Sequence, residues 1–167
     1  IAIYLGFCLP KVPSRGGFSF RQLPQLLRNK PLVRLYIFTL LVVTGYYTGY
    51  SYIEPFMGQV AHLSENMITT TLMVFGIMGI IGSFAYSRFY PKRPYLFMCV
   101  AILIITTCLS SLGLAASIPV LAMAICGFWG MAVNGFNVAM QQAVIDNSST
   151  EATAVAMSIY SGIYNLG

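Results

Sequence analysis

The stretch YLFMCVAILIITTCLSSLGLA, residues 95–115, contains no charged side chain. About 20 apolar residues in a helix are enough to cross the hydrocarbon core of a bilayer. In the whole chain 8% of residues are charged and 57% are hydrophobic, whereas soluble domains carry about 25% charged residues. The chain therefore lacks the polar surface of a soluble domain, and this stretch predicts a membrane-spanning helix.

Further apolar runs lie on both sides of this stretch. Three of them, at residues 35–56, 67–86 and 120–144, are long enough to span a bilayer, and two shorter ones lie at residues 1–9 and from residue 152 onward. The sequence thus predicts an all-α, polytopic transmembrane helical bundle with four full spans and two incomplete ones. We expect the chain to be a piece of a longer protein.

The basic residues are confined to two segments. All nine Lys and Arg fall within residues 11–34 and 88–93, whereas the loop at residues 58–66 has none. Since basic residues near span ends stay on the cytoplasmic side, we expect both basic segments inside and that loop outside. Residues 18–27 have an amphipathic pattern that predicts a short helix on the membrane surface. Apolar spans separate the basic segments, unlike the clustered basic face of a nucleic-acid-binding protein, so no nucleic-acid partner is expected.

Polar side chains within the predicted spans recur at helical spacing and form three stripes. Their members are Thr44, Tyr47, Thr48, Ser51 and Glu54 on the first span, Asn134, Asn137 and Gln141 beside Trp129 on the fourth, and Ser158, Ser161 and Asn165 on the incomplete span. Polar groups inside a membrane usually face other helices or a cavity. Three such stripes predict a shared cavity whose amides and aromatic rings suit a neutral polyol. The alternative is that these groups only bond packed helices together.

Glu54 is the one acid within a predicted span. A carboxylate there is costly unless it is paired, hydrated or protonated, which makes Glu54 a candidate proton carrier. Its place near the outer end leaves open that it simply reaches solvent. The following Pro55 frees a backbone carbonyl and predicts a bend or gate.

Nothing in the sequence indicates catalysis or metal binding. The cysteines form no CxxC pair, and His62 has no partner at metal-ligand spacing. No nucleophile motif or phosphate-binding loop is present. We expect no enzyme activity, no metal and no cofactor.

Four segments resemble bacterial sugar efflux transporters of the drug:proton antiporter group in the major facilitator superfamily. In chain order they are LPQLLRNKP (residues 23–31), YYTGYSYIEPF (46–56), GIIGS (79–83) and YSGIYNLG (160–167). The resemblance implies a fold of twelve helices in two halves. Residues 1–9 would then be the end of helix 6, residues 10–34 the cytoplasmic loop between the halves, and residues 35–167 an incomplete C-terminal half with helices 7–10 and part of helix 11.

The resemblance also implies a function, namely export of sugars by proton antiport across the bacterial inner membrane. Its partners would be a sugar such as arabinose, a lactose-like sugar or a thiogalactoside, together with protons, the lipid bilayer and the missing N-terminal half. In this interpretation Glu54 serves coupling or gating, and the substrate contacts are Tyr47, Ser51, Asn134, Asn137, Gln141 and Asn165. Multidrug or other small-molecule efflux, or a non-transporting membrane scaffold or receptor, are the alternatives.

The loop motif of the superfamily, Gly-x-x-x-Asp-Arg-x-Gly-Arg-Arg, is only partly present in this chain. Residues 82–93 keep Arg88, Lys92 and Arg93 as a conformational loop, but Tyr86 and Ser87 stand where the aspartate is expected. A charge relay on this side of the protein is therefore in question. With an incomplete cavity wall, the chain is not expected to transport by itself.

Overall fold

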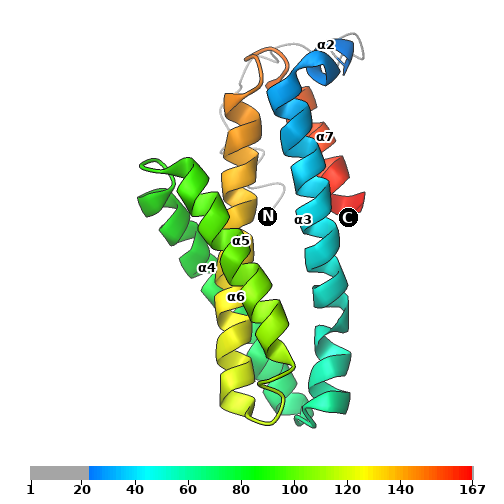
Figure 1. Ribbon diagram of the computed structural model, residues 1–167, viewed down its shortest axis with the longest axis vertical. Helices are drawn as coiled ribbons and strands as arrows, with labels where there is room; N and C mark the ends of the chain where they lie inside the picture. Colours follow the sequence, from blue (N-terminus) through cyan, green and yellow to red (C-terminus); the bar gives the residue numbers. More distant parts are fainter. Residues whose placement is uncertain (1–22, 167) are drawn as a thin grey trace, which may run out of the picture.

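The computed structural model describes residues 23–166, which fold into an antiparallel bundle of helices (Figure 1). The elements are α2 (Leu23–Arg28), α3 (Lys30–Pro55), the π-helix η2 (Phe56–Val60), α4 (Glu65–Phe89), α5 (Pro94–Leu112), α6 (Pro119–Asp146) and α7 (Thr153–Leu166). By length and composition, four helices can cross a membrane, namely Lys30–Val60, α4, α5 and α6. The predicted all-α bundle with four full spans is confirmed for these residues. The partial span at residues 1–9 lies outside them.

The first long helix begins five residues before the apolar run that predicted it, at Lys30. Asn29 caps it, because its Oδ1 accepts a hydrogen bond from the backbone N–H of Leu32 at 3.3 Å. The same side chain donates from Nδ2 to the carbonyl oxygen of Asn147 at 2.8 Å and so ties α3 to the α6–α7 loop. Of the predicted surface helix at residues 18–27, only the part that forms α2 lies within the described residues.

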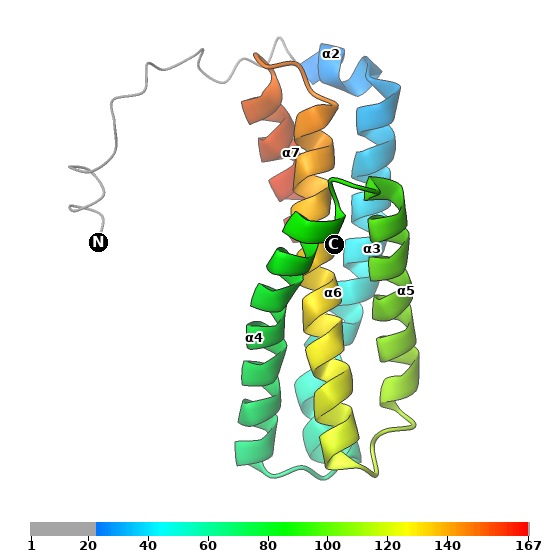
Figure 2. The ribbon, with the colours of Figure 1, turned by 90° about the vertical axis from the view of Figure 1, so that its left-hand side faces the viewer.

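Helix α6 is the centre of the bundle. Half of its apolar window is buried, compared with 17–22% for the other three spans. It packs between α4 and α5, and it also contacts α7 and α3, which pack against each other (Figure 2). A side chain on α6 can therefore meet any of four neighbouring helices, depending on where it lies around the helix.

Two glycines bring the backbones of α4 and α6 together. A Cβ atom at Gly82 would overlap the carbonyl oxygen of Met131, and one at Gly130 would overlap the carbonyl oxygen of Phe75. Small residues allow this approach, which maximises van der Waals contact between helices in a membrane. Gly45 and Gly76, by contrast, have nothing within 4 Å in the described part of the chain.

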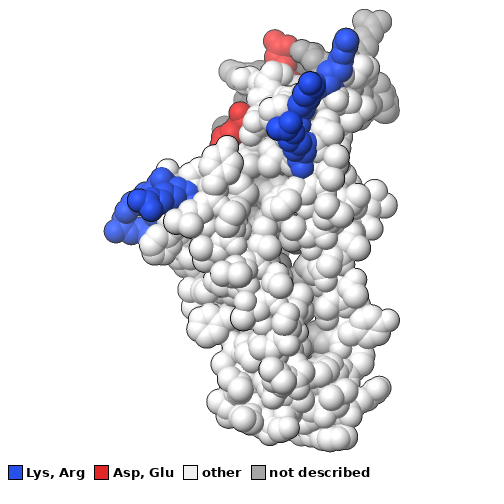
Figure 3. Space-filling view, viewed as in Figure 1, with Lys and Arg blue, Asp and Glu red and all other residues white. Residues whose placement is uncertain are grey.

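The basic side chains gather at one end of the bundle, the upper end in Figure 3. Within residues 23–166 they come from the α2–α3 region, the last turn of α4 and the loop before α5, and they are Arg28, Lys30, Arg34, Arg88, Lys92 and Arg93. The turns at residues 61–64 and 113–118 form the other end. This distribution is the one that the positive-inside rule produces when the basic end faces the cytoplasm.

Candidate functional site

Asn137 and Gln141 of α6 form a hydrogen-bonded group with Tyr160 of α7. The Oδ1 of Asn137 accepts from the Oη of Tyr160 at 2.8 Å and from the Nε2 of Gln141 at 3.2 Å. Tyr160 is 3% exposed, and the two amides are half-buried. With the amides in these orientations, the Nδ2 of Asn137 and the Oε1 of Gln141 take no part in the two bonds. They provide one donor and one acceptor on the same face of α6.

Tyr164 extends this group from α7 to α3. Its ring centroid lies 6.0 Å from that of Tyr160 and 6.0 Å from that of Tyr47. Tyr47 is half-buried on α3. We call Tyr47, Asn137, Gln141, Tyr160 and Tyr164 the amide–phenol cluster. It joins three helices with side chains that are polar and uncharged.

A second group, the aromatic cluster, lies beside the first and consists of Tyr46, Tyr50, Phe75 and Trp129. Around Trp129 the ring centroids are 5.4 Å away for Phe75, 6.0 Å for Tyr46 and 6.4 Å for Tyr50. Tyr46 also lies 4.9 Å from Tyr47, so the two clusters touch. Trp129 is 1% exposed, and its Nε1 has no hydrogen-bond partner among the described residues. Such a buried N–H group is uncommon in folded proteins.

Asn134 lies in a different contact from Asn137. Its Nδ2 donates to the carbonyl oxygen of Gly79 at 2.5 Å and to the Oγ of Ser83 at 3.1 Å, both on α4. Side chains three residues apart on a helix point in directions that differ by about 60°. Here that difference is enough for Asn134 to contact α4 and for Asn137 to contact α7. The amide nitrogen of Asn134 therefore joins two helices, which is the alternative role considered for this stripe.

The structure does not bring Ser51, Glu54 and Asn165 into either cluster. Ser51 and Glu54 lie on the exposed face of α3. Asn165 is exposed on α7 and donates from Nδ2 to the carbonyl oxygen of Ser161 in its own helix, at 2.7 Å. These three side chains are exposed in the described bundle.

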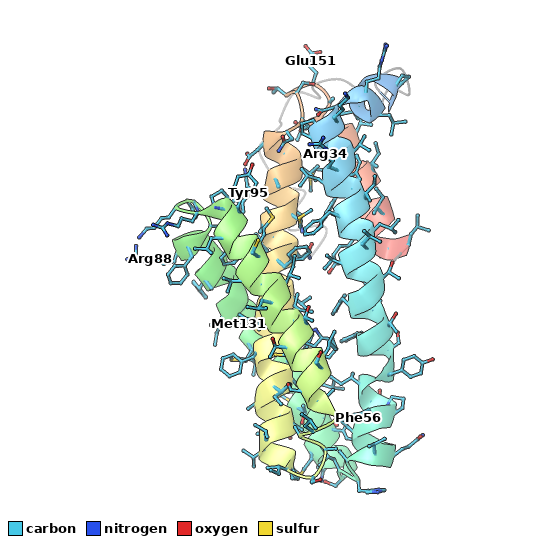
Figure 4. The ribbon with its side chains drawn as sticks, in the orientation of Figure 1. Arg34, Phe56, Arg88, Tyr95, Met131 and Glu151 are labelled. Atoms are coloured by element: carbon cyan, nitrogen blue, oxygen red, sulfur yellow. The ribbon has the colours of Figure 1, made fainter. Side chains whose placement is uncertain are left out.

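Pro55 does not break the helix that contains Glu54. The chain continues as the π-helix η2, and the N–H of Phe56 points to the carbonyl oxygens of Ile53 and Tyr52. Phe56 marks this level near the lower end of the bundle in Figure 4. The π-helix ends at Val60. Two residues later His62 has a left-handed φ of 51°, a conformation that His adopts more readily than most residues. Where a bend was predicted, the structure has a π-helix, a feature frequent at functional sites.

Comparison with known proteins decides the family. Residues 7–167 match the Major Facilitator Superfamily. This chain belongs to that superfamily. A probable sugar efflux transporter of Mannheimia succiniciproducens is 41% identical over 167 residues, which is all of this chain and 42% of that protein. The chain thus spans about two fifths of this relative's length, and the resemblance carried by the four segments is confirmed.

Of the three basic residues predicted to form a conformational loop, Lys92 and Arg93 lie between α4 and α5, whereas Arg88 lies in the last turn of α4. All three are exposed (Figure 4 labels Arg88). Tyr86, at a motif position expected to be acidic, packs its ring 4.8 Å from Tyr90. Burial raises the pKa of Tyr90, and the carboxylate of Asp146 raises it further. Tyr90 and Asp146 also line the same cavity, so the end of α6 supplies an acid beside this loop.

The two clusters contain three residues that were not members of the predicted polar stripes, namely Phe75, Tyr160 and Tyr164. Tyr160 and Tyr164 are spaced i, i+4 and so share a helix face, a signal that the sequence does contain. Phe75 lies on α4, which carries no such stripe, and nothing in its sequence context distinguishes it from other apolar residues in that span.

Proposed function

We propose that the complete protein exports sugars or similar neutral solutes across the bacterial inner membrane by proton antiport. In this proposal the described bundle is part of the C-terminal half, and the segment before Lys30 leads to it from an N-terminal half. Membership of the superfamily supports a transport function over an enzymatic one, and the name of the 41% identical relative supports sugar as the substrate.

The observation that carries the proposal is the amide–phenol cluster. Its five members are uncharged and offer donors and acceptors from three helices, as the hydroxyls of a neutral sugar require. The adjoining aromatic cluster supplies flat apolar rings for the C–H faces of the sugar. The buried Nε1 of Trp129 gains an acceptor if a sugar hydroxyl reaches it.

The residues divide into three roles in this proposal. Tyr47, Asn137 and Gln141 contact the sugar directly, and Asn134 positions α4 against α6. Ser51 and Asn165 are exposed in the described bundle, so we assign their contacts to a cavity that closes only with the other half of the protein. Glu54, exposed at the outer end of α3, carries the proton or gates the outer side.

The proposal is tested with the full-length protein in proteoliposomes. A labelled thiogalactoside should move across the membrane faster when a pH gradient is imposed, and unlabelled arabinose or lactose should compete. Protein that binds none of these sugars and moves none of them would contradict the proposed function and favour a scaffold or receptor.

Glu54→Gln tests the coupling role separately. The amide has nearly the shape of the carboxyl group but cannot carry a proton. We expect sugar exchange at equal pH to survive, while the acceleration by the pH gradient is lost. Glu65→Gln, which changes an exposed acid at the start of α4, is the matched control. Full gradient-driven transport in Glu54→Gln would remove Glu54 from coupling.

The aromatic cluster favours one alternative, export of apolar or cationic drugs. Aromatic rings bind cations through their π faces. Four such rings pack together in the aromatic cluster, those of Tyr46, Tyr50, Phe75 and Trp129. A lipophilic cation that competes with the thiogalactoside, and is itself exported, would favour this substrate class.

A further inference from the structure

A groove of about 380 Å³ lies between α4 and α5, with α6 as its floor. Its lining is apolar except at one end, where Lys92 and Arg93 stand at the mouth. The apolar lining comprises Gly82, Ala85, Phe89, Leu96, Phe97, Val100, Ala101, Ile104, Met131 and Ala132. Phe89, Leu96 and Val100 are 59%, 52% and 44% exposed, so the groove opens to the outside of the bundle.

This groove is separate from the proposed sugar site. Helix α6 directs Asn137 toward α7, whereas it directs Met131 and Ala132 into the groove. Figure 4 places Met131 and Arg88 on the same side of the bundle, away from α3. The groove therefore lies on a different face of α6 from the proposed sugar contacts.

The length of the groove matches one leaflet of a bilayer. From Arg93 to Ile104 the lining follows α5 for 11 residues, about 16 Å at 1.5 Å per residue. One leaflet contributes about 15 Å of a hydrocarbon core that is about 30 Å thick. A chain lying in the groove would thus run from the polar boundary to the bilayer midplane.

The mouth of the groove is positively charged. Arg88 in the last turn of α4 is close in sequence to Lys92 and Arg93 in the loop that follows, and the sequence has no Asp or Glu between Glu65 and Asp146. Asp146 accepts a hydrogen bond from the Nε2 of Gln142 at 2.7 Å. It lines a different cavity, between α3, α5 and α6. Basic pockets between helices on the cytoplasmic side attract anionic lipid headgroups.

We infer that this groove binds an anionic phospholipid of the cytoplasmic leaflet. One acyl chain lies along Leu96, Val100 and Ile104, and the phosphate of the headgroup contacts Lys92 and Arg93. The inference rests on the groove and its charges and holds whether or not the protein exports sugar.

Native mass spectrometry of the detergent-purified full-length protein tests the headgroup contact. Phosphatidylglycerol should bind more tightly than phosphatidylcholine, and the double variant Lys92→Gln/Arg93→Gln should lose about 25-fold in phosphatidylglycerol affinity, roughly fivefold for each basic residue. The control Arg28→Gln/Lys30→Gln removes the same charge at the same end of the bundle and should keep the affinity. Equal losses in both double variants, or no preference for phosphatidylglycerol, would overturn the inference.

The acyl chain is tested by filling the groove. Val100→Trp places an indole in the lining and should weaken phosphatidylglycerol binding at least tenfold. Leu103→Trp, on the same helix at a position that is 66% exposed and outside the lining, should leave it unchanged. Glycerol phosphate, which has the headgroup charge without a chain, should not displace the lipid. If it does, or if Val100→Trp binds like the unmodified protein, the groove holds no acyl chain.

Discussion

At the scale of single residues, two asparagines three positions apart on α6 have different surroundings. Asn134 bonds to α4, where its amide holds two helices together. Asn137 bonds to Tyr160 and Gln141, and its amide nitrogen stays outside those bonds. Substitution of these two residues therefore separates a packing role from a binding role.

Asn137→Ala should weaken sugar binding about fivefold, because it removes about one neutral hydrogen bond, worth about 1 kcal/mol. Asn134→Ala should mainly lower stability, by about 0.6–1.7 kcal/mol, the range for hydrogen bonds between helices in membranes. Sugar titration and thermal melting of the full-length protein measure the two effects. If both variants bind and transport sugar like the unmodified protein, α6 does not line the site.

The sequence predicted that α6 carries a stripe of amides, because i, i+3, i+7 spacing fixes a shared helix face. It did not predict which neighbour each amide meets. That depends on the α4–α6 contact, which requires Gly82 and Gly130 from distant parts of the chain. The exposed positions of Ser51 and Asn165 were likewise not predictable from spacing within their own helices.

At the scale of elements, the α4–α6 contact should be sensitive to a single methyl group. Gly82→Ala would place its Cβ against the carbonyl oxygen of Met131, and overpacking of this kind costs about 1–3 kcal/mol. Gly76→Ala, on the same helix with nothing within 4 Å, is the control and should leave the melting temperature unchanged or raise it. Equal melting temperatures for the two variants would show that α4 and α6 do not approach this closely.

The limits of the spans were predicted to within a few residues, except at the start of α3. The apolar run begins at residue 35, but the helix begins at Lys30 because Asn29 caps it. Capping is a local side-chain contact, and a pattern based on hydropathy does not record it. The π-helix after Pro55 is similar, since proline predicts a missing hydrogen bond but not the path that the backbone then takes.

At the scale of the whole molecule, we expect the distribution of basic residues to set the orientation in the membrane. With the basic end in the cytoplasm, a cysteine replacing Ser64 should react in intact cells with a membrane-impermeant maleimide. A cysteine replacing Arg88 should react only after permeabilisation, in a full-length background without other cysteines. The reverse pattern would contradict the orientation.

Composition and span length were sufficient to predict the helical membrane bundle, because lipid allows few other folds. The packing order around α6 required the structure, since every span is apolar and no run indicates its partners.

The most direct test of the sugar site compares amides at neighbouring positions on one helix. Gln141 belongs to the amide–phenol cluster, whereas Gln142 donates to Asp146 at 2.7 Å. Calorimetric titration of the full-length protein with a thiogalactoside should show about 25-fold weaker binding in Asn137→Ala/Gln141→Ala, about fivefold for each lost hydrogen bond. Binding in Gln142→Ala should be unchanged. If the double variant binds as tightly as Gln142→Ala, the cluster is not the sugar site.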